Sequence, residues 1–155
     1  LFSRYSRSDR EKAQEALERV GMLKYARKSY TLLSGGERQL VLIARALAQG
    51  ASLFIMDEPV SGLDYGNQLR LLEQIDALAS QGYTFLKSTH YPDHAMMVST
   101  RVIMLRDGTV RADGTPKEVV TPESIAELYD VRVSMHDHPS GMRLCVPEPF
   151  GGVRA

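Results

Sequence analysis

The chain has 155 residues and no net charge, because 19 Lys and Arg residues balance 19 Asp and Glu residues. With 43% hydrophobic and 25% charged residues, it has the composition of an ordinary globular domain, not that of a collagen-like or low-complexity chain. The neutral balance argues against a nucleic-acid-binding protein. The one cysteine, Cys145, excludes an internal disulfide, and no apolar run approaches the roughly 18 residues that span a bilayer.

The first third of the chain predicts two helices and a strand. Ser8 and Glu11 have the spacing of a capping box, and apolar residues at helical intervals follow, which predicts an amphipathic helix over 9–20. A serine and two glycines at 34–36 open a second amphipathic helix. The apolar residues 51–56 are too few for a helix between breakers, so they predict a strand buried on both faces, as in a parallel sheet.

The rest of the chain alternates between helical and extended patterns. The expected elements are a helix over 65–80 capped by Asp64, a strand over 83–88, a short helix over 92–98, a hairpin over 101–112, two Thr-Pro helix starts at Thr115 and Thr121, and a terminal strand pair over 131–136 and 143–146. This alternation favours a layered α/β domain.

Ser34, Gly35 and Gly36 form the first candidate site. The start of a helix exposes unpaired N–H groups, and glycines let a ligand approach the backbone closely, so such a corner can bind a phosphate. The same three residues also make an ordinary helix cap. This segment by itself therefore leaves both interpretations open.

Asp57 and Glu58 directly follow the strand predicted over 51–56. Ligands bind at the carboxyl ends of strands in open α/β sheets, and adjacent residues in an extended segment point in different directions. One carboxylate can therefore bind a metal ion while the other forms a hydrogen bond to a water molecule. The alternative is that both carboxylates simply face solvent. His90 follows the next strand and, if the two strands are parallel, shares this sheet edge with Glu58; a structural histidine is the alternative.

Four segments are far more specific together than apart. They are residues 33–39 (Leu-Ser-Gly-Gly-Glu-Arg-Gln), 53–59 (Leu-Phe-Ile-Met-Asp-Glu-Pro), 61–64 (Ser-Gly-Leu-Asp) and 88–90 (Ser-Thr-His). In this order they resemble the signature motif, Walker B strand, D-loop and switch histidine of the nucleotide-binding domain of ABC-transporter ATPases. The resemblance covers essentially the whole chain. It implies part of an α/β P-loop NTPase domain, with a mostly parallel sheet flanked by helices.

The resemblance also implies ATP and Mg²⁺ as cofactors. Asp57 would hold the Mg²⁺ region through water, and Glu58 would act as the general base that polarises the attacking water. His90 would sense the γ-phosphate and stabilise the developing charge.

Further residues come from the signature motif and the D-loop. Ser34, Gly35, Gly36 and Glu37 would contact an ATP molecule bound mainly by the opposite subunit. Asp64 would lie at the seam of the dimer. By the same resemblance, residues 1–50 would belong to the helical subdomain and residues 51–155 to the C-terminal part of the ATPase core.

The family's phosphate-binding loop, Gly-x-x-x-x-Gly-Lys-Ser/Thr, does not occur in the 155 residues. Since the family places this loop upstream of the signature motif, we expect the chain to be the C-terminal part of a longer ATPase. We also expect the isolated chain to be inactive and marginally stable or prone to aggregation, because strands of its sheet would lack their neighbours.

Within the family, the stretch Ser-Thr-His-Tyr-Pro-Asp-His-Ala at 88–95 is similar to importer ATPases for iron chelates, haem or cobalamin. The implied partners are a second ATPase subunit in a head-to-tail dimer and transmembrane permease subunits, with no nucleic acid. The implied location is cytoplasmic, peripheral on the inner face of the cell membrane. The cargo is not encoded in these motifs.

Two other functions remain open at this point. One is a soluble ABC-type ATPase that acts on nucleic acid or the ribosome, which would favour tandem cassettes or a large insertion near the signature motif. The other is a non-enzymatic truncated product with at most a dimerisation surface.

Overall fold

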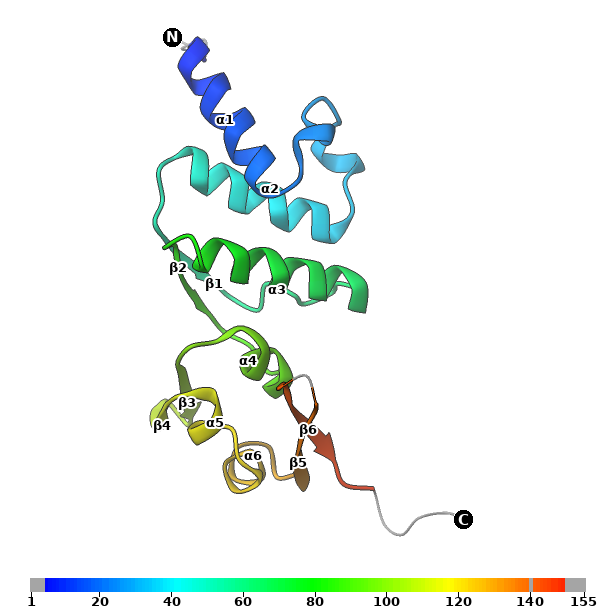
Figure 1. Ribbon diagram of the computed structural model, residues 1–155, viewed down its shortest axis with the longest axis vertical. Helices are drawn as coiled ribbons and strands as arrows, with labels where there is room; N and C mark the ends of the chain where they lie inside the picture. Colours follow the sequence, from blue (N-terminus) through cyan, green and yellow to red (C-terminus); the bar gives the residue numbers. More distant parts are fainter. Residues whose placement is uncertain (1–4, 140, 150–155) are drawn as a thin grey trace. The chain divides into compact units, whose positions relative to one another are not determined.

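The computed structural model describes residues 5–139 and 141–149. The chain divides into two compact units, one ending at Ser88 and the other beginning at Thr89. Figure 1 draws the helices and strands in chain order. Within the described ranges, no helix combines the length and the apolar character needed to cross a membrane.

The first unit consists of helices that pack on one another in sequence order and of one strand pair. Its elements are α1 (Arg7–Arg19), the 3₁₀ turns η1 (Leu23–Tyr25) and η2 (Tyr30–Leu32), α2 (Gly35–Ala48), β1 (Leu53–Met56), α3 (Tyr65–Ala79) and β2 (Thr84–Lys87). α1 packs on α2, and α2 packs on α3. The helices predicted over 9–20, from 34 onward and over 65–80 are confirmed.

The start of α1 differs from the predicted capping box. The Ser6 hydroxyl accepts a hydrogen bond from the Asp9 amide at 3.1 Å, and the Asp9 carboxylate accepts one from the Ser6 amide at 2.8 Å. Ser8 and Glu11 have the same spacing but lie inside the helix, so the expectation that they form the box is wrong. Ser6 takes the cap because its backbone is extended, which lets its side chain turn back onto the first helical turn.

α3 carries an apolar stripe that anchors the core of the first unit. Leu71, Leu72, Ile75 and Leu78 are each at most 3% exposed, at the spacing of one helix face. Each such side chain contributes about 1.5–3 kcal/mol on burial. Further buried apolar residues of this unit are Ala16, Val20, Met22, Leu33, Ile43, Ala44, Phe54 and Val60.

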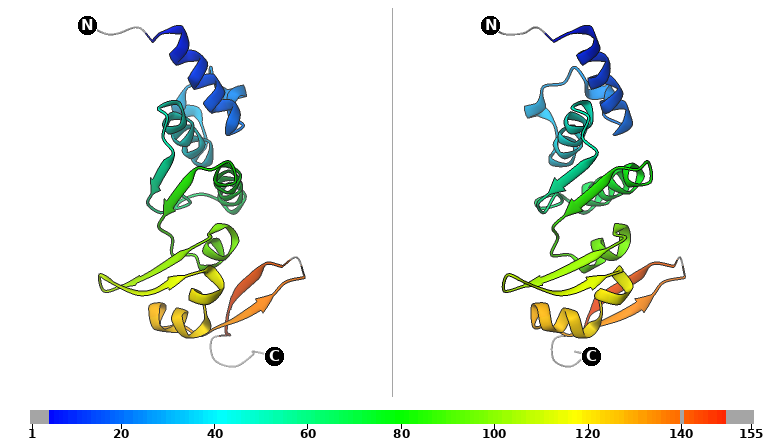
Figure 2. Two further views of the ribbon diagram at one scale, coloured as in Figure 1. Left: turned by 60° about the vertical axis from the view of Figure 1, so that its left-hand side comes forward. Right: turned by 90° about the vertical axis from the view of Figure 1, so that its left-hand side faces the viewer.

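β1 and β2 form the parallel pair of the first unit, and Figure 2 shows them running in the same direction. Phe54 is buried and stacks on Phe85, with ring centroids 4.6 Å apart. On the other face, Leu53 is 54% exposed and Ile55 is 76% exposed. The expectation that this strand is buried on both faces is therefore wrong, because the described residues cover only the face that carries Phe54.

The second unit combines two antiparallel hairpins with short helices. Its elements are α4 (Pro92–Val98), β3 (Val102–Arg106), β4 (Thr109–Gly114), α5 (Pro116–Val119), α6 (Pro122–Tyr129), β5 (Val133–Asp137) and β6 (Arg143–Pro147). β3 pairs with β4, and β5 pairs with β6. The core of this unit contains Met104, Val119, Val120, Ile125 and Val133. The predicted hairpin and terminal strand pair are confirmed.

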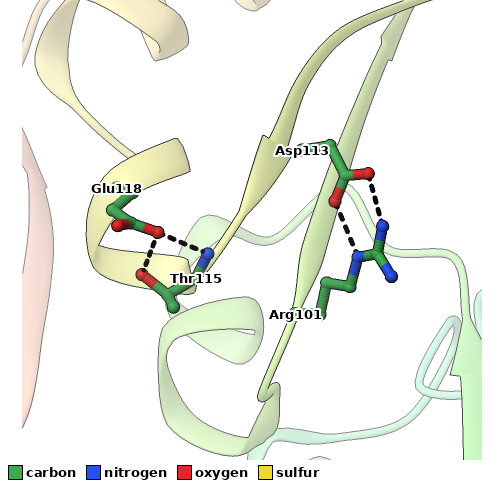
Figure 3. A network of polar contacts seen from close by, with 4 residues as sticks. All are labelled: Arg101, Asp113, Thr115 and Glu118. Atoms are coloured by element: carbon green, nitrogen blue, oxygen red, sulfur yellow. Dashed lines mark hydrogen bonds and ion pairs between the residues drawn. The ribbon is translucent and has the colours of Figure 1, made fainter.

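Polar contacts lie at the open end of the β3–β4 hairpin, where β3 begins and β4 ends (Figure 3). Arg101 Nε and Nη2 donate to the two carboxylate oxygens of Asp113 at 2.7 and 2.6 Å, and these bonds lower the pKa of Asp113. Next along the chain, the Thr115 amide and hydroxyl both donate to the Glu118 carboxylate, at 2.9 and 2.8 Å. The Thr-Pro start of α5 is thus confirmed as a helix cap.

The α/β class is confirmed, but the sheets of the described residues are small and differ in strand direction. Of the strand pairs in the described residues, β1–β2 is parallel, whereas β3–β4 and β5–β6 are antiparallel. Few residues separate the strands of each antiparallel pair in the sequence, whereas the whole of α3 lies between β1 and β2 in the chain. A parallel pair needs such a long crossover, so the expected mostly parallel sheet is here limited to one pair.

Candidate functional site

The start of α2 carries the first group of predicted site residues. Ser34 caps the helix: its hydroxyl accepts from the Glu37 amide at 3.2 Å, and the Glu37 carboxylate accepts from the Ser34 amide at 2.8 Å. The second of these bonds is the main reason that the pKa of Glu37 is lowered. At this helix start Ser34 is exposed and Gly35 is partly exposed.

Gly35 and Gly36 are held against the segment before α3. A Cβ atom at Gly35 would come within 2.9 Å of Leu63 Cδ2, and one at Gly36 within 3.0 Å of the Asn67 side chain. Gly36 is buried. The two glycines are therefore required for close packing inside the chain, a role that neither of the two sequence-based interpretations, an anion site or a helix cap, included.

Asp64 caps α3 through Asn67. Its Oδ1 accepts from the Asn67 amide at 2.9 Å, and its Oδ2 accepts from Asn67 Nδ2 at 2.6 Å. Chiefly because of the backbone bond, the pKa of Asp64 is lowered. The same Asn67 side chain faces Gly36, so the structure brings the start of α2 and Asp64 together through one residue that sequence reasoning missed.

Asp57 and Glu58 lie where β1 ends, and both are exposed. The end of β2 lies beside them, because the strands are parallel and Met56 is opposite Lys87. The hydroxyl of Ser88 donates to Asp57 Oδ1 at 2.5 Å and accepts from the Glu58 amide at 2.8 Å. The expectation of a carboxylate pair at a parallel strand end is met, and Ser88 is a second residue that sequence reasoning missed.

Glu58 has an unusual backbone conformation. Its φ of 40° lies in the left-handed region, which non-glycine residues seldom occupy and which costs about 1–3 kcal/mol. Such conformations occur preferentially at active sites and ligand-binding segments. The sequence carried no signal for it, since the residue is not glycine, asparagine or aspartate.

His90 lies in the second unit, where it is exposed and its ring centroid is 4.1 Å from that of Tyr91. Tyr91 also contacts His94, which is buried. The structure thus brings together Ser34, Gly35, Gly36, Glu37 and Asp64 in one part of the first unit, and Asp57 and Glu58 at a strand end of that unit. His90, the remaining predicted site residue, belongs to the second unit.

The family model, the related proteins and the solved structures that resemble this chain all point to the same family. A model of the family described as "ABC transporter" matches residues 2–61. The chain is 38% identical over 149 residues to the ferric enterobactin transport ATP-binding protein of Escherichia coli K12, covering 95% of this chain and 55% of the relative. The chain belongs to the ATP-binding proteins of ABC transporters. It spans about half the length of the curated relatives it matches.

Two further comparisons extend this result. The hypophosphite import ATP-binding protein of Stutzerimonas stutzeri is 43% identical over 141 residues, which is 90% of this chain and 41% of the relative. A solved structure described as a metal-chelate type ABC transporter in an inward-facing conformation superposes with a TM-score of 0.86 and 29% identity, over 96% of this chain and 60% of that chain. The α/β fold is thus that of part of an ABC ATPase.

Proposed function

We propose that this chain forms part of the ATP-hydrolysing machinery of an ABC importer. The observation that carries the proposal is the end of β1, where two exposed carboxylates, Asp57 and Glu58, stand beside the end of a parallel strand. Ligands bind at this edge in α/β sheets of this kind. Membership of the family makes ATP the ligand to test there.

The chemistry assigned to this edge is hydrolysis of the γ-phosphate. Glu58 acts as general base and takes a proton from the attacking water, for which it must lie within hydrogen-bond reach of that water. His90 donates a hydrogen bond to the γ-phosphate and stabilises the charge that develops on it. The support for His90 is its place two residues after Ser88 in the sequence.

Asp57 is the residue proposed to bind Mg²⁺ through water. Nucleotide sites hold Mg²⁺ by one or two carboxylates together with phosphate oxygens and water. The exposed Asp57 carboxylate fits this pattern. Within 5–139 and 141–149, no group of three or more His, Cys, Asp and Glu residues is placed to hold a metal by itself. Bound Mg²⁺ would neutralise phosphate charge.

The start of α2 is proposed to contact an ATP molecule held mainly by a second subunit. Ser34, Gly35, Gly36 and Glu37 would face its γ-phosphate, since the positive end of a helix favours an anion. Asp64 would lie at the seam between the subunits. This arrangement requires a head-to-tail dimer, with residues 1–50 in the helical subdomain and 51–155 in the ATPase core.

The relatives support a role in transport. Permease subunits would be the membrane partners, and the chain would act at the inner face of the cell membrane. We propose a metal chelate as the cargo, which the enterobactin transporter and the metal-chelate type structure support. A related protein is named a hypophosphite import ATP-binding protein, so a similar ATPase serves a different cargo. ATP-driven import is therefore the part of the proposal that all of these relatives support.

The decisive experiment is Glu58→Gln in the ATPase assembly that contains this chain and supplies its phosphate-binding loop. Loss of the base should lower kcat for ATP hydrolysis by about 100-fold or more, while ATP still binds. Glu73→Gln is the matched control, because Glu73 is an exposed glutamate on α3. Phosphate release and filter binding of ATP measure the two properties.

The other outcomes separate the alternatives. Unchanged turnover in Glu58→Gln would remove the general-base assignment. If neither the wild-type assembly nor the variant binds ATP, a non-enzymatic protein is the better description. Turnover that responds to RNA or ribosomes and not to permease would favour the non-transport ATPase.

A further inference from the structure

Ser88 ties together the ends of the two parallel strands. It directly follows β2, and in the parallel register Lys87 lies opposite Met56, so Ser88 meets the first residues after β1. The Ser88 amide donates to the Met56 carbonyl at 3.0 Å. Its hydroxyl donates to Asp57 Oδ1 at 2.5 Å and accepts from the Glu58 amide at 2.8 Å. One side chain therefore contacts both neighbouring acidic residues.

The hydroxyl is suited to this position because it donates and accepts at the same time. Its donated bond fixes the orientation of the Asp57 carboxylate. Its accepted bond stabilises the Glu58 amide in the conformation with φ of 40°, which sets the direction in which the Glu58 side chain leaves the backbone. Removing the hydroxyl would remove the hydrogen bonds that hold the Asp57 carboxylate and the Glu58 amide in place.

We propose that Ser88 is a positioning residue for ATP hydrolysis, which acts through Glu58 and Asp57 and does not itself contact the nucleotide. This inference rests on the proposed function, in which Glu58 is the base. Residues that orient a reacting group through hydrogen bonds commonly change activity by about 10- to 100-fold when they are removed. The affinity for ATP depends on other contacts, so it should not change when such an orienting residue is removed.

The test is Ser88→Ala in the same ATPase assembly. We expect kcat to fall by about 10- to 100-fold with KM for ATP unchanged. Ser88→Thr retains the hydroxyl and should keep most of the activity, whereas Ser88→Val, which matches threonine in shape, should not. Ser80→Ala is the control, since Ser80 is an exposed serine at the C-terminal cap of α3. The Thr and Val pair decides the matter even if the alanine variant folds poorly.

Two readouts show whether Ser88 acts through Glu58. Hydrogen exchange of the Glu58 amide should be faster in Ser88→Val than in Ser88→Thr, because its acceptor is lost. In a double-mutant cycle, Ser88→Val should lower the residual rate of Glu58→Gln much less than it lowers that of the wild type. Equal effects in both backgrounds would overturn the inference.

Failure of this inference differs from failure of the proposed function. An active wild type that needs Glu58 but shows equal kcat in Ser88→Thr and Ser88→Val overturns the role of Ser88 only. A wild-type assembly without ATP hydrolysis, or full activity in Glu58→Gln, overturns the proposed function and the role of Ser88 together.

Discussion

At the scale of single residues, the packing around Gly36 leaves no room for a side chain at the start of α2. A Cβ atom there would lie 3.0 Å from Cβ, Cγ and Oδ1 of Asn67, inside normal van der Waals separation. Asn67 also binds both carboxylate oxygens of Asp64. Any displacement of Asn67 would therefore disturb the cap of α3 as well as the start of α2.

We expect Gly36→Ala to lower the free energy of unfolding by roughly 1–3 kcal/mol, the usual cost of an overpacked group. Gly66→Ala is the matched control, because its Cβ would meet Asp64 Oδ1 at 3.5 Å and Arg70 Nη2 at 3.9 Å, which are ordinary contacts. Gly66 lies in the first turn of α3, so alanine there should stabilise by about 0.5–1 kcal/mol. Urea unfolding followed by circular dichroism compares the two; wild-type stability in Gly36→Ala would argue against the packing role.

At the scale of elements, the start of α2 depends on a reciprocal cap. Ser34 and Glu37 each satisfy a backbone amide of the other. The pKa of Glu37 is lowered mainly by the bond from the Ser34 amide, with smaller contributions from the Tyr25 hydroxyl and the charge of Lys28, while burial opposes the change. The residues proposed to face ATP therefore also begin the helix.

We expect Ser34→Ala to destabilise the chain by about 1 kcal/mol, the typical cost of losing an N-cap. Because the pKa of Glu37 is lower in the folded state, its contribution is complete above the unfolded value of 4.5 and is lost as the pH falls through the folded value. Glu37→Gln keeps an acceptor oxygen but does not titrate, so it should flatten this part of the acid dependence. Unfolding between pH 3 and pH 7, with Glu73→Gln for comparison, measures it; an unchanged acid slope in Glu37→Gln would contradict the cap.

At the scale of the whole molecule, one face of the β1–β2 pair is open. Leu53, Ile55 and Leu86 are each more than half exposed on these strands. Exposed apolar side chains on a short sheet favour association with other chains. Nor do the 155 residues contain the sequence of a phosphate-binding loop.

We therefore expect the purified 155-residue chain to be prone to aggregation and to show no repeated turnover of ATP. Ile55→Thr should reduce aggregation, because it removes the most exposed apolar side chain of this face. Leu42→Thr, at an exposed leucine on α2, is the control and should have less effect. Light scattering and phosphate release measure both properties. Steady turnover by the pure chain would show that it carries a complete active site.

Local signals in the sequence determined much of this protein. Capping residues, helical periodicity and turn residues specify the helices, because these interactions act within a few positions along the chain. The ordered motifs determined the family. The Asp64 cap could be predicted in this way, and the resemblance implied a mostly parallel sheet. The competition between Ser6 and Ser8 for the cap of α1 could not be predicted, since both have the correct spacing.

Only the tertiary structure decided which distant residues meet. Ser88 reaches Asp57 and Glu58 across 31 and 30 positions of sequence, and Gly36 meets Asn67, because two strands and two helix starts lie side by side. The same packing decided that Phe54 is buried while Ile55 is exposed. Alternation along a strand places the two side chains on opposite faces, but what covers each face depends on the surrounding elements.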